Sequence, residues 1–180
     1  MLTAQMNMTP DGFCNHDAVI ADDAFLHFAA DLVEAADTVL LGRKTFDLFV
    51  AHWPDAARDD ATQPAERRLA QAIDTTPRLV ASRSLGGSDW PGTQIIADLD
   101  APALADATSR GDVLLLGSPS LFDQMAARGA LDRIILTVHP MLAGRGHRLL
   151  AQSTLDPALY RAGEARQFAS GTCSFEFLRH

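Results

Sequence analysis

The chain has 180 residues, of which 47% are hydrophobic and 21% charged, and its formal net charge is -8. A chain of this length and composition is typical of a globular protein and excludes a disordered one, so we expect one domain spanning residues 1–180. The acidic balance disfavours nucleic acid as a partner, because binding to a phosphate backbone requires clustered Lys and Arg side chains.

The sequence offers no sign of export or membrane insertion. Cys14 and Cys173 are its two cysteines; they lie far apart without CxxC spacing, so we expect free thiols in a reducing compartment. The first residues lack the basic region and apolar run of a signal peptide. No apolar stretch approaches the ~20 residues that a membrane span requires. We therefore expect a cytoplasmic protein without a membrane partner.

Hydrophobic periodicity and turn residues predict an alternation of strands and helices. In chain order we expect a strand at 2–8, a helix from 22 or 23 to about 36, a strand at 38–41, a helix at 44–50, an exposed polar loop at 52–62, a helix from 64, a strand at 78–82, a glycine-rich loop at 86–92, a strand at 93–97, a helix at 102–109, a strand at 113–116, a helix at 120–128, and strands at 133–139, 160–168 and 172–178. Wholly apolar runs such as 38–41 are typical of buried parallel strands, whereas the last two strands alternate and suggest an antiparallel pair. The pattern predicts an α/β sandwich with a mixed sheet that is antiparallel at its C-terminal edge.

Two buried strands run into a glycine and then directly into a helix: Leu41-Gly42-Arg43-Lys44-Thr45 and Leu116-Gly117-Ser118-Pro119-Ser120-Leu121. A helix N-terminus offers unpaired N–H groups and a partial positive charge, so two such junctions can clamp a pyrophosphate. A third polar segment, Ser82-Arg83-Ser84, follows another strand, at the kind of strand end where ligands of open α/β sheets bind. Strand–glycine–helix junctions are also common as simple turns, so this alternative stays open.

Several common site signatures are absent from the sequence. There is no GxGxxG opening a helix after a strand and no Walker A sequence, which disfavours a Rossmann dehydrogenase or a P-loop enzyme. The six histidines form no HExxH, and His139 and His147 are interpreted as a strand-end and a loop residue, so no metal site is expected. No serine lies in GxSxG, so a hydrolase triad has no support.

Five segments stand in the order found in the dihydrofolate-reductase-like superfamily, and the chain resembles its riboflavin-biosynthesis branch, the C-terminal reductase domain of bifunctional deaminase-reductases. Residues 40–46 resemble the GR-x-T junction, 79–83 the second cofactor strand and 115–121 the pyrophosphate turn. Residues 137–146 resemble the HPvllGxG loop, and 7–12 stand where the branch has an S/T-x-D-G loop. The resemblance implies a three-layer α/β sandwich with a central mixed, mostly parallel sheet and antiparallel C-terminal strands.

The resemblance also implies a cofactor, NADPH, and a small-molecule substrate. Arg43 with Ser82 and Arg83 would receive the 2′-phosphate, and Thr45 with the turn from Gly117 through Ser118, Pro119 and Ser120 to Leu121 would hold the pyrophosphate, beside Gly42 and Lys44. The substrate would lie near Asn7, Asp11, Phe13 and Trp53. Asp11 is the candidate catalytic residue, although Pro-Asp-Gly is itself a turn signal.

Departures from the family pattern leave alternatives open. Ser118-Pro119 replaces a second glycine, and proline removes one N–H donor from the pyrophosphate turn. Asp23 is the nearest match to the pterin-binding acid of dihydrofolate reductases, although a helix cap explains it equally well. The chain lacks the zinc signature of the deaminase half, so it is no complete bifunctional enzyme.

The sequence thus predicts an NADPH-dependent reductase that transfers a hydride to a small heterocyclic or carbonyl/imine substrate. The alternatives are genuine dihydrofolate reductase activity, a non-catalytic NADP-binding protein, and a fold whose cofactor site is vestigial. A homodimer is expected from the relatives.

Overall fold

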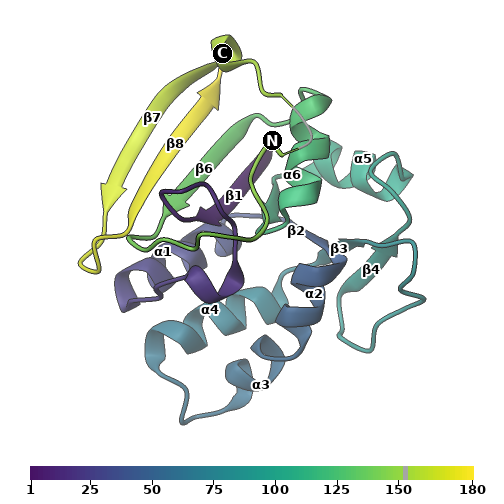
Figure 1. The fold of residues 1–180 in the computed structure, drawn as a ribbon. Helices are drawn as coiled ribbons and strands as arrows, with labels where there is room; N and C mark the ends of the chain where they lie inside the picture. Colours follow the sequence, from purple (N-terminus) through teal and green to yellow (C-terminus); the bar gives the residue numbers. More distant parts are fainter. Residues whose placement is uncertain (152–153) are drawn as a thin grey trace. The chain divides into compact units, whose positions relative to one another are not determined.

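Residues 1–151 and 154–180 are described by a computed structural model (Figure 1). Its eight strands follow the hydrogen-bonded order β4-β3-β2-β5-β1-β6-β8-β7. The chain divides into two compact units, one made of Met1–Asp22 with Leu115–His180 and the other of Asp23–Leu114, which we call the terminal unit and the central unit. In the described residues, none of the helices combines the length and apolar character required to cross a membrane.

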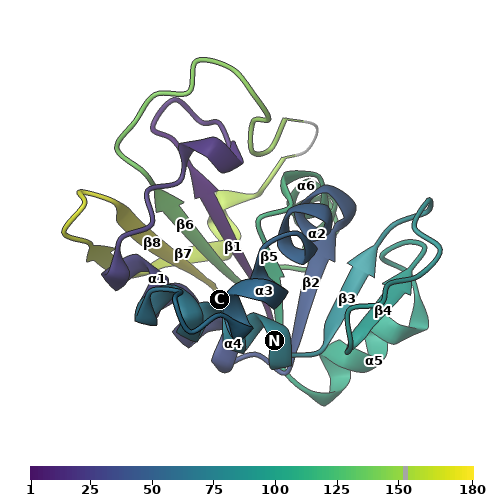
Figure 2. The same cartoon turned by 90° about the horizontal axis from the view of Figure 1, so that it is seen from below.

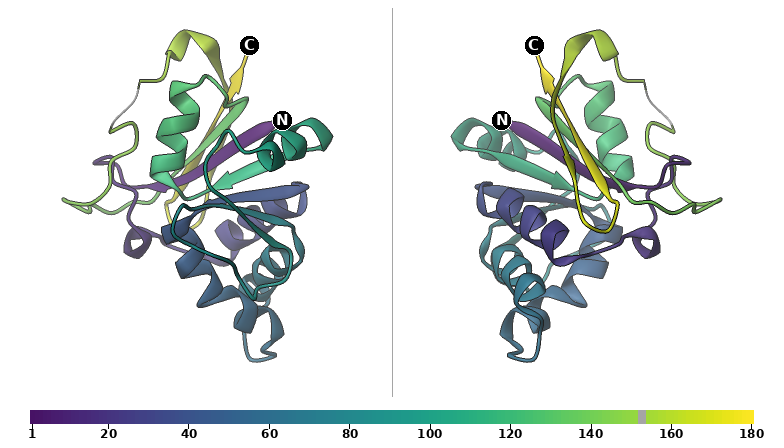
Figure 3. Two further views of the ribbon diagram at one scale, coloured as in Figure 1. Left: turned by 90° about the vertical axis from the view of Figure 1, so that its right-hand side faces the viewer. Right: turned by 90° about the vertical axis from the view of Figure 1, so that its left-hand side faces the viewer.

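The central unit contains three parallel strands, β2 (Thr38–Gly42), β3 (Arg78–Ala81) and β4 (Thr93–Ile96), drawn side by side in Figure 2. Its helices are α1 (Asp23–Glu34), α2 (Arg43–Val50), α3 (Trp53–Arg58), α4 (Pro64–Thr75) and α5 (Pro102–Arg110). Helix α4 packs against both α1 and α3, and Figure 3 shows α1 and α4 lying together. The strand β5 (Val113–Leu116) includes the boundary between the two units.

The terminal unit contains β1 (Leu2–Met8), β6 (Arg133–Val138), β7 (Tyr160–Gln167) and β8 (Cys173–Arg179). Strands β1 and β6 are parallel, whereas β8 is antiparallel to both β6 and β7. Helix α6 (Pro119–Ala127) and two 3-10 turns, His16–Ala18 and Pro157–Leu159, complete the unit. The predicted mixed sheet, with antiparallel strands at the C-terminal end of the chain, is confirmed. The single-domain assignment stays a prediction.

The predicted strands and helices are present within one or two residues of their expected ends, but the polar loop expected at 52–62 is wrong in its first half. Residues Trp53–Arg58 form α3. Pro54 stands in its first turn, where a missing N–H costs nothing. Ala56 is buried, and Arg58 forms an ion pair with Asp74 of α4 (3.2 Å). The helix therefore depends on packing against α4, which a polar local sequence does not announce.

The most heavily bonded side chain of the central unit is Arg78, which is 1% exposed at the start of β3. Its guanidinium donates to the main-chain oxygens of Ile73, Asp74 and Thr76, which end α4, and to that of Pro91. It also lies over the ring of Trp90, with 3.9 Å from Cζ to the ring centroid. The Arg78 guanidinium thereby caps the C-terminus of α4, where positive charge is favoured, and fixes the loop before β4.

Replacing this side chain tests its role. We expect Arg78→Met to lower the free energy of unfolding by about 2–4 kcal/mol, because buried carbonyl oxygens lose their donors while methionine replaces only the apolar contact with Trp90. Urea unfolding followed by circular dichroism measures the change.

The matched control is Arg110→Met, which removes the same charge from α5, where the Arg110 side chain is 78% exposed and pairs with Asp106 of its own helix. A change within about 0.5 kcal/mol is expected there. Equal losses in the two variants would contradict the assignment.

Candidate functional site

The junction between β2 and α2 brings together the first group of predicted residues. Gly42 pairs with Ala81 across the ends of two parallel strands, and its extended backbone (φ -81°, ψ 159°) leads directly into α2. Arg43, the first residue of α2, donates from Nη1 to Ser84 Oγ (2.5 Å) and lies 3.5 Å from the Asp47 carboxylate. The loop after β3 and the start of α2 are therefore in direct contact.

The loop after β3 is shaped by Ser82, which is 9% exposed. Its hydroxyl oxygen accepts hydrogen bonds from the amides of Ser84 (3.3 Å) and Leu85 (3.0 Å). Arg83, which lies between Ser82 and Ser84, is exposed. Ser82 thus forms the turn, whereas Arg83 extends from it and Ser84 makes the contact with Arg43. Sequence reasoning included Ser84 in this segment but did not select it as a site residue.

Three cations gather at the carboxyl ends of β2 and β3. The side chains of Arg43, Lys44 and Arg83 are all exposed, and Thr45 is half-buried in the first turn of α2. Arg guanidinium groups bind phosphate through paired donors, and a helix N-terminus adds amide donors and positive potential. The arrangement fits a phosphate monoester held at the edge of the central unit.

Trp53 lies at the start of α3 rather than in a loop. The side chain is half-buried, and its ring meets those of His52 (4.8 Å between centroids) and Phe49 (5.9 Å) edge to face. His52 pairs in turn with Glu66 of α4 (2.8 Å). Trp53 is therefore part of an aromatic cluster that belongs to the central unit.

The turn before α6 holds the second predicted group, in the terminal unit. Gly117 has a positive φ of 57°, and its amide donates to the Gln5 carbonyl (3.1 Å). The Ser118 hydroxyl donates to the Leu116 carbonyl, and the Ser118 carbonyl accepts from the amide of Leu121. Pro119 has no N–H. The Gly117 amide and the Ser118 hydroxyl are therefore engaged within the terminal unit, and Pro119 offers no amide donor to an anion.

Asp11 joins two loops of the terminal unit. Its carboxylate accepts from the Thr9 hydroxyl (2.5 Å) and from the amides of Ala143 (3.3 Å) and Gly144 (2.8 Å). These donors, the Thr9 hydroxyl first, hold the pKa of Asp11 below its usual range against the opposing effect of burial. The carboxylate is ionised at neutral pH and fastens the loop after β6 to the loop after β1.

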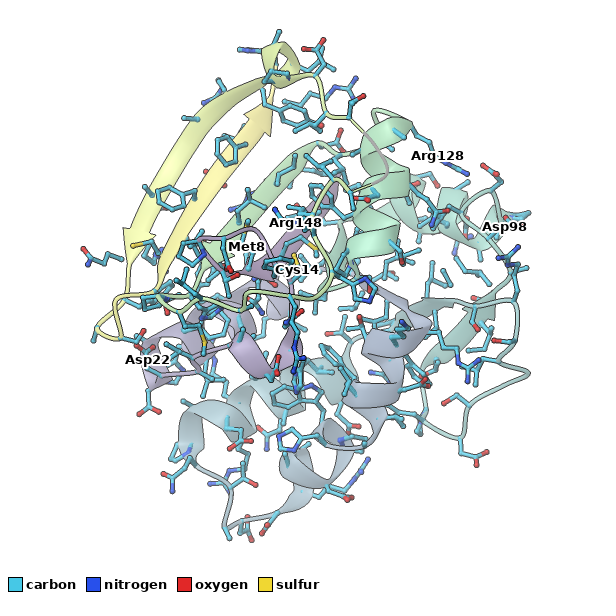
Figure 4. The ribbon with its side chains drawn as sticks, viewed as in Figure 1. Met8, Cys14, Asp22, Asp98, Arg128 and Arg148 are labelled. Atoms are coloured by element: carbon cyan, nitrogen blue, oxygen red, sulfur yellow. The ribbon has the colours of Figure 1, made fainter. Side chains whose placement is uncertain are left out.

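The same two loops also meet at Phe13, which is 7% exposed and forms a bridge with Arg148. The Arg148 guanidinium covers the Phe13 ring, at 4.4 Å from the centroid. The Cys14 amide donates to the His147 carbonyl (2.7 Å), and Figure 4 labels Cys14 and Arg148. Cys14 and Cys173 are free thiols. Burial, reinforced by the charge of Asp123, raises the pKa of Cys14 to about 11, so this thiol stays protonated and is a poor nucleophile.

Asn7, near the end of β1, is half-buried and belongs to a polar group that sequence reasoning did not find. Its side-chain oxygen lies 2.9 Å from Gln5 Nε2 and 3.2 Å from Nε2 of His139. His139 follows β6 and is completely buried. The available signal was the HP segment at 139–140, which was matched to the HPvllGxG loop, with His139 itself interpreted as a strand-end residue and given no role in the site.

Comparison with known proteins places these segments in context. The model of the RibD C-terminal domain matches residues 1–174. The uncharacterized protein YyaP of Bacillus subtilis (strain 168) is 28% identical over 120 residues, which are 66% of this chain and 62% of that protein, so the chain spans less than two thirds of this relative.

Two solved structures resemble the fold over nearly the whole of both chains. One is a Shewanella sp. PV-4 protein provisionally assigned to riboflavin biosynthesis (TM-score 0.67, 16% identity, 99% of this chain and 98% of that chain). The other is dihydrofolate reductase from Enterococcus faecalis complexed with NADP(H) and RAB-propyl (TM-score 0.67, 14% identity, 100% and 96%). The predicted dihydrofolate-reductase-like fold is confirmed.

The contacts of Asp11 predict a titration. Because its pKa is lowered in the folded protein, the loop attachment stabilises the fold above the usual pKa of an aspartate and is lost as pH falls through the folded value. We expect the carboxyl carbon of Asp11 to titrate below the range of exposed aspartates by NMR. We also expect Asp11→Asn to speed hydrogen exchange of the Ala143 and Gly144 amides several-fold, because one acceptor oxygen is lost.

Asp98→Asn is the control, because the Asp98 carboxylate accepts from the nearby Asp100 amide in a turn of the central unit. Exchange at Ala143 and Gly144 should be unchanged in that variant. A normal titration of Asp11, or unchanged exchange in Asp11→Asn, would show that Asp11 does not hold the loop.

Proposed function

The chain belongs to the RibD C-terminal domain family, and we propose that it is an NADPH-dependent reductase that transfers a hydride to a small heterocyclic or carbonyl/imine substrate. The observation that carries the proposal is the group of three exposed cations, Arg43, Lys44 and Arg83, at the carboxyl ends of β2 and β3. Ligands of open α/β sheets bind at such strand ends.

The residues present fit the phosphate groups of this cofactor. Arg43 and Arg83 would hold the 2′-phosphate, with the Ser84 hydroxyl beside Arg43 and the turn formed by Ser82 setting the direction of Arg83. Lys44, Thr45 and the amides that follow Gly42 would serve the pyrophosphate from the central unit. The turn from Gly117 to Leu121 in the terminal unit stays a proposed pyrophosphate-binding segment, with Ser120 supplying the donor that Pro119 lacks. When bound, NADPH supplies the hydride.

On the substrate side, Asn7, Asp11, Phe13 and Trp53 stay the proposed contacts. Asp11 is ionised at neutral pH, so it is no proton donor in its resting state and would act as a hydrogen-bond acceptor that orders the loop over the substrate. Phe13 would contribute an apolar wall supported by Arg148. Because hydride transfer takes its chemistry from the cofactor, the protein needs to supply mainly binding and orientation.

The dihydrofolate reductase similarity is a likeness of fold, and the alternative of genuine dihydrofolate reduction gains no support from Asp23, which is exposed at the first residue of α1. Methotrexate-sensitive oxidation of NADPH by dihydrofolate would establish that alternative. A homodimer and a cytoplasmic location stay predictions.

The cofactor assignment predicts a preference for NADPH over NADH. Each charge-assisted hydrogen bond to the 2′-phosphate contributes about 1.5–3 kcal/mol, reduced by the exposure of both arginines, so we expect a preference of about tenfold to hundredfold. Arg43→Ala combined with Arg83→Ala should abolish most of this preference while changing NADH affinity little. Isothermal titration calorimetry with both nucleotides measures it.

Arg110→Ala is the control, since it removes an arginine charge, one where the double variant removes two, from an exposed position of the same unit. It should leave both affinities unchanged. Absence of binding to either nucleotide would reject the reductase proposal, and NADPH binding without hydride transfer to a broad panel of acceptors would favour a non-catalytic NADP-binding protein.

A further inference from the structure

A main-chain amide fixes the protonation of His139. The amide of Ile20 donates to Nδ1 of the ring (3.0 Å), and because an amide N–H can only donate, Nδ1 must be the acceptor. The Thr172 hydroxyl also lies 3.3 Å from Nδ1. The ring is completely buried, and burial lowers the pKa of His139 against the opposing charge of Asp22. His139 is therefore a neutral imidazole with its hydrogen on Nε2.

This tautomer fixes the orientation of the Asn7 amide. Nε2 of His139 lies 3.2 Å from the Asn7 side-chain oxygen and, having the hydrogen, donates to it. Gln5 Nε2 donates to the same oxygen (2.9 Å) and is held in place by the Thr137 hydroxyl, which accepts from it at 3.2 Å. Turning the Asn7 amide over would direct its N–H groups at two donors. The oxygen of Asn7 thus faces inward, fully engaged.

The nitrogen of the same amide is left with donors to offer. Among residues 1–151 and 154–180, no acceptor is bonded to Asn7 Nδ2, although the residue is only half exposed. Polar groups near the interior of proteins are normally satisfied, so a directed donor pair at the end of a strand is available for a ligand. The pairing of Asn7 with Thr137 across β1 and β6 holds its backbone in the sheet.

We propose that Asn7 is a specificity-determining residue that only donates hydrogen bonds to the substrate, and that His139 is the positioning residue that imposes this polarity. The site therefore selects compounds that present an acceptor, a carbonyl oxygen or an unprotonated ring nitrogen, and disfavours compounds that present an N–H there. The inference rests on the proposed function in placing the substrate at Asn7.

The variant Asn7→Asp isolates this polarity. A carboxylate has nearly the same shape and still accepts from His139 and Gln5, yet it has no N–H to offer and adds a negative charge. The probes are quinoxaline, whose ring nitrogens are acceptors, and 1,2,3,4-tetrahydroquinoxaline, in which the same nitrogens bear hydrogens. Affinities are measured by NMR titration with saturating NADP⁺ and without it.

The probe ratio is the affinity for quinoxaline divided by the affinity for tetrahydroquinoxaline. We expect this ratio to be about tenfold or more higher in the wild-type protein than in Asn7→Asp. Thr3→Val is the matched control: Thr3 is buried on the same strand, β1, and within the described residues no hydrogen bond joins its side chain to Asn7, Gln5 or His139. That variant should leave the ratio unchanged. An equal ratio in wild type and Asn7→Asp, or no binding of either probe to the wild-type protein, overturns the inference.

The role of His139 has its own readout. ¹⁵N NMR of the histidine ring should show hydrogen on Nε2 and none on Nδ1 at neutral pH, and the opposite tautomer or an imidazolium overturns the inference without any ligand. If His139→Phe folds, it should reduce the probe ratio when residue 7 is asparagine. Added to Asn7→Asp, the same substitution should leave the probe ratio unchanged. Failure of wild type to bind NADP⁺ would count against the proposed function, whereas the tautomer and the probe ratio without cofactor still test the polarity of Asn7.

Discussion

The central unit depends on one buried cation. The Arg78 guanidinium takes the last carbonyl groups of α4 and that of Pro91, and it supports the ring of Trp90. Trp90 in turn donates to the Asp74 carboxylate (2.7 Å) and packs near Phe46 of α2. Because α2 begins with Arg43, the position of the proposed phosphate site follows from packing that starts at the opposite end of β3. A cation buried without these acceptors would be strongly destabilising, so the arrangement specifies one geometry.

In the terminal unit, the hydrogen-bonded polar network consists of neutral side chains rather than a buried cation. Polar residues occupy paired positions on its adjacent strands: the half-buried Asn7 on β1, the buried Thr137 on β6 and the buried Ser174 on β8. The buried Gln5 stands two residues before Asn7 on β1. Apolar side chains there would avoid every desolvation cost, so the network is not explained by stability alone. Its directionality is the more informative property, because it begins at a backbone amide whose role cannot reverse and ends at the side chain of Asn7.

How far the sequence predicts this protein depends on whether the decisive interactions are local. The buried strands β2 and β5 are evident from their continuous apolar runs, and Gly42 and Gly117 correctly mark the junctions that follow them. Helix α3 was missed because it is stabilised by α4 rather than by its own residues. Trp90 was not expected to be buried, because the glycine-rich segment around it indicates only a loop. The bonds from Arg43 to Ser84 and from His139 to Asn7 join residues far apart in the sequence, and no spacing rule predicts them.

Asp11 and Asn7, only four residues apart, differ in what they can do for a hydride transfer. An acceptor compound gains negative charge on the oxygen or nitrogen next to the carbon that receives the hydride, and preorganised donors stabilise this charge. Asp11 is anionic and its oxygens are occupied by Thr9, Ala143 and Gly144, so it would oppose such charge at close range. Asn7 is neutral, and its inward oxygen is held by two donors, which leaves its N–H groups as the complementary partner. On the proposed function, Asp11 organises the loop and Asn7 polarises the substrate. The two roles differ because the oxygens of Asp11 and the oxygen of Asn7 are already hydrogen-bonded within the fold, whereas the N–H groups of Asn7 remain for the substrate.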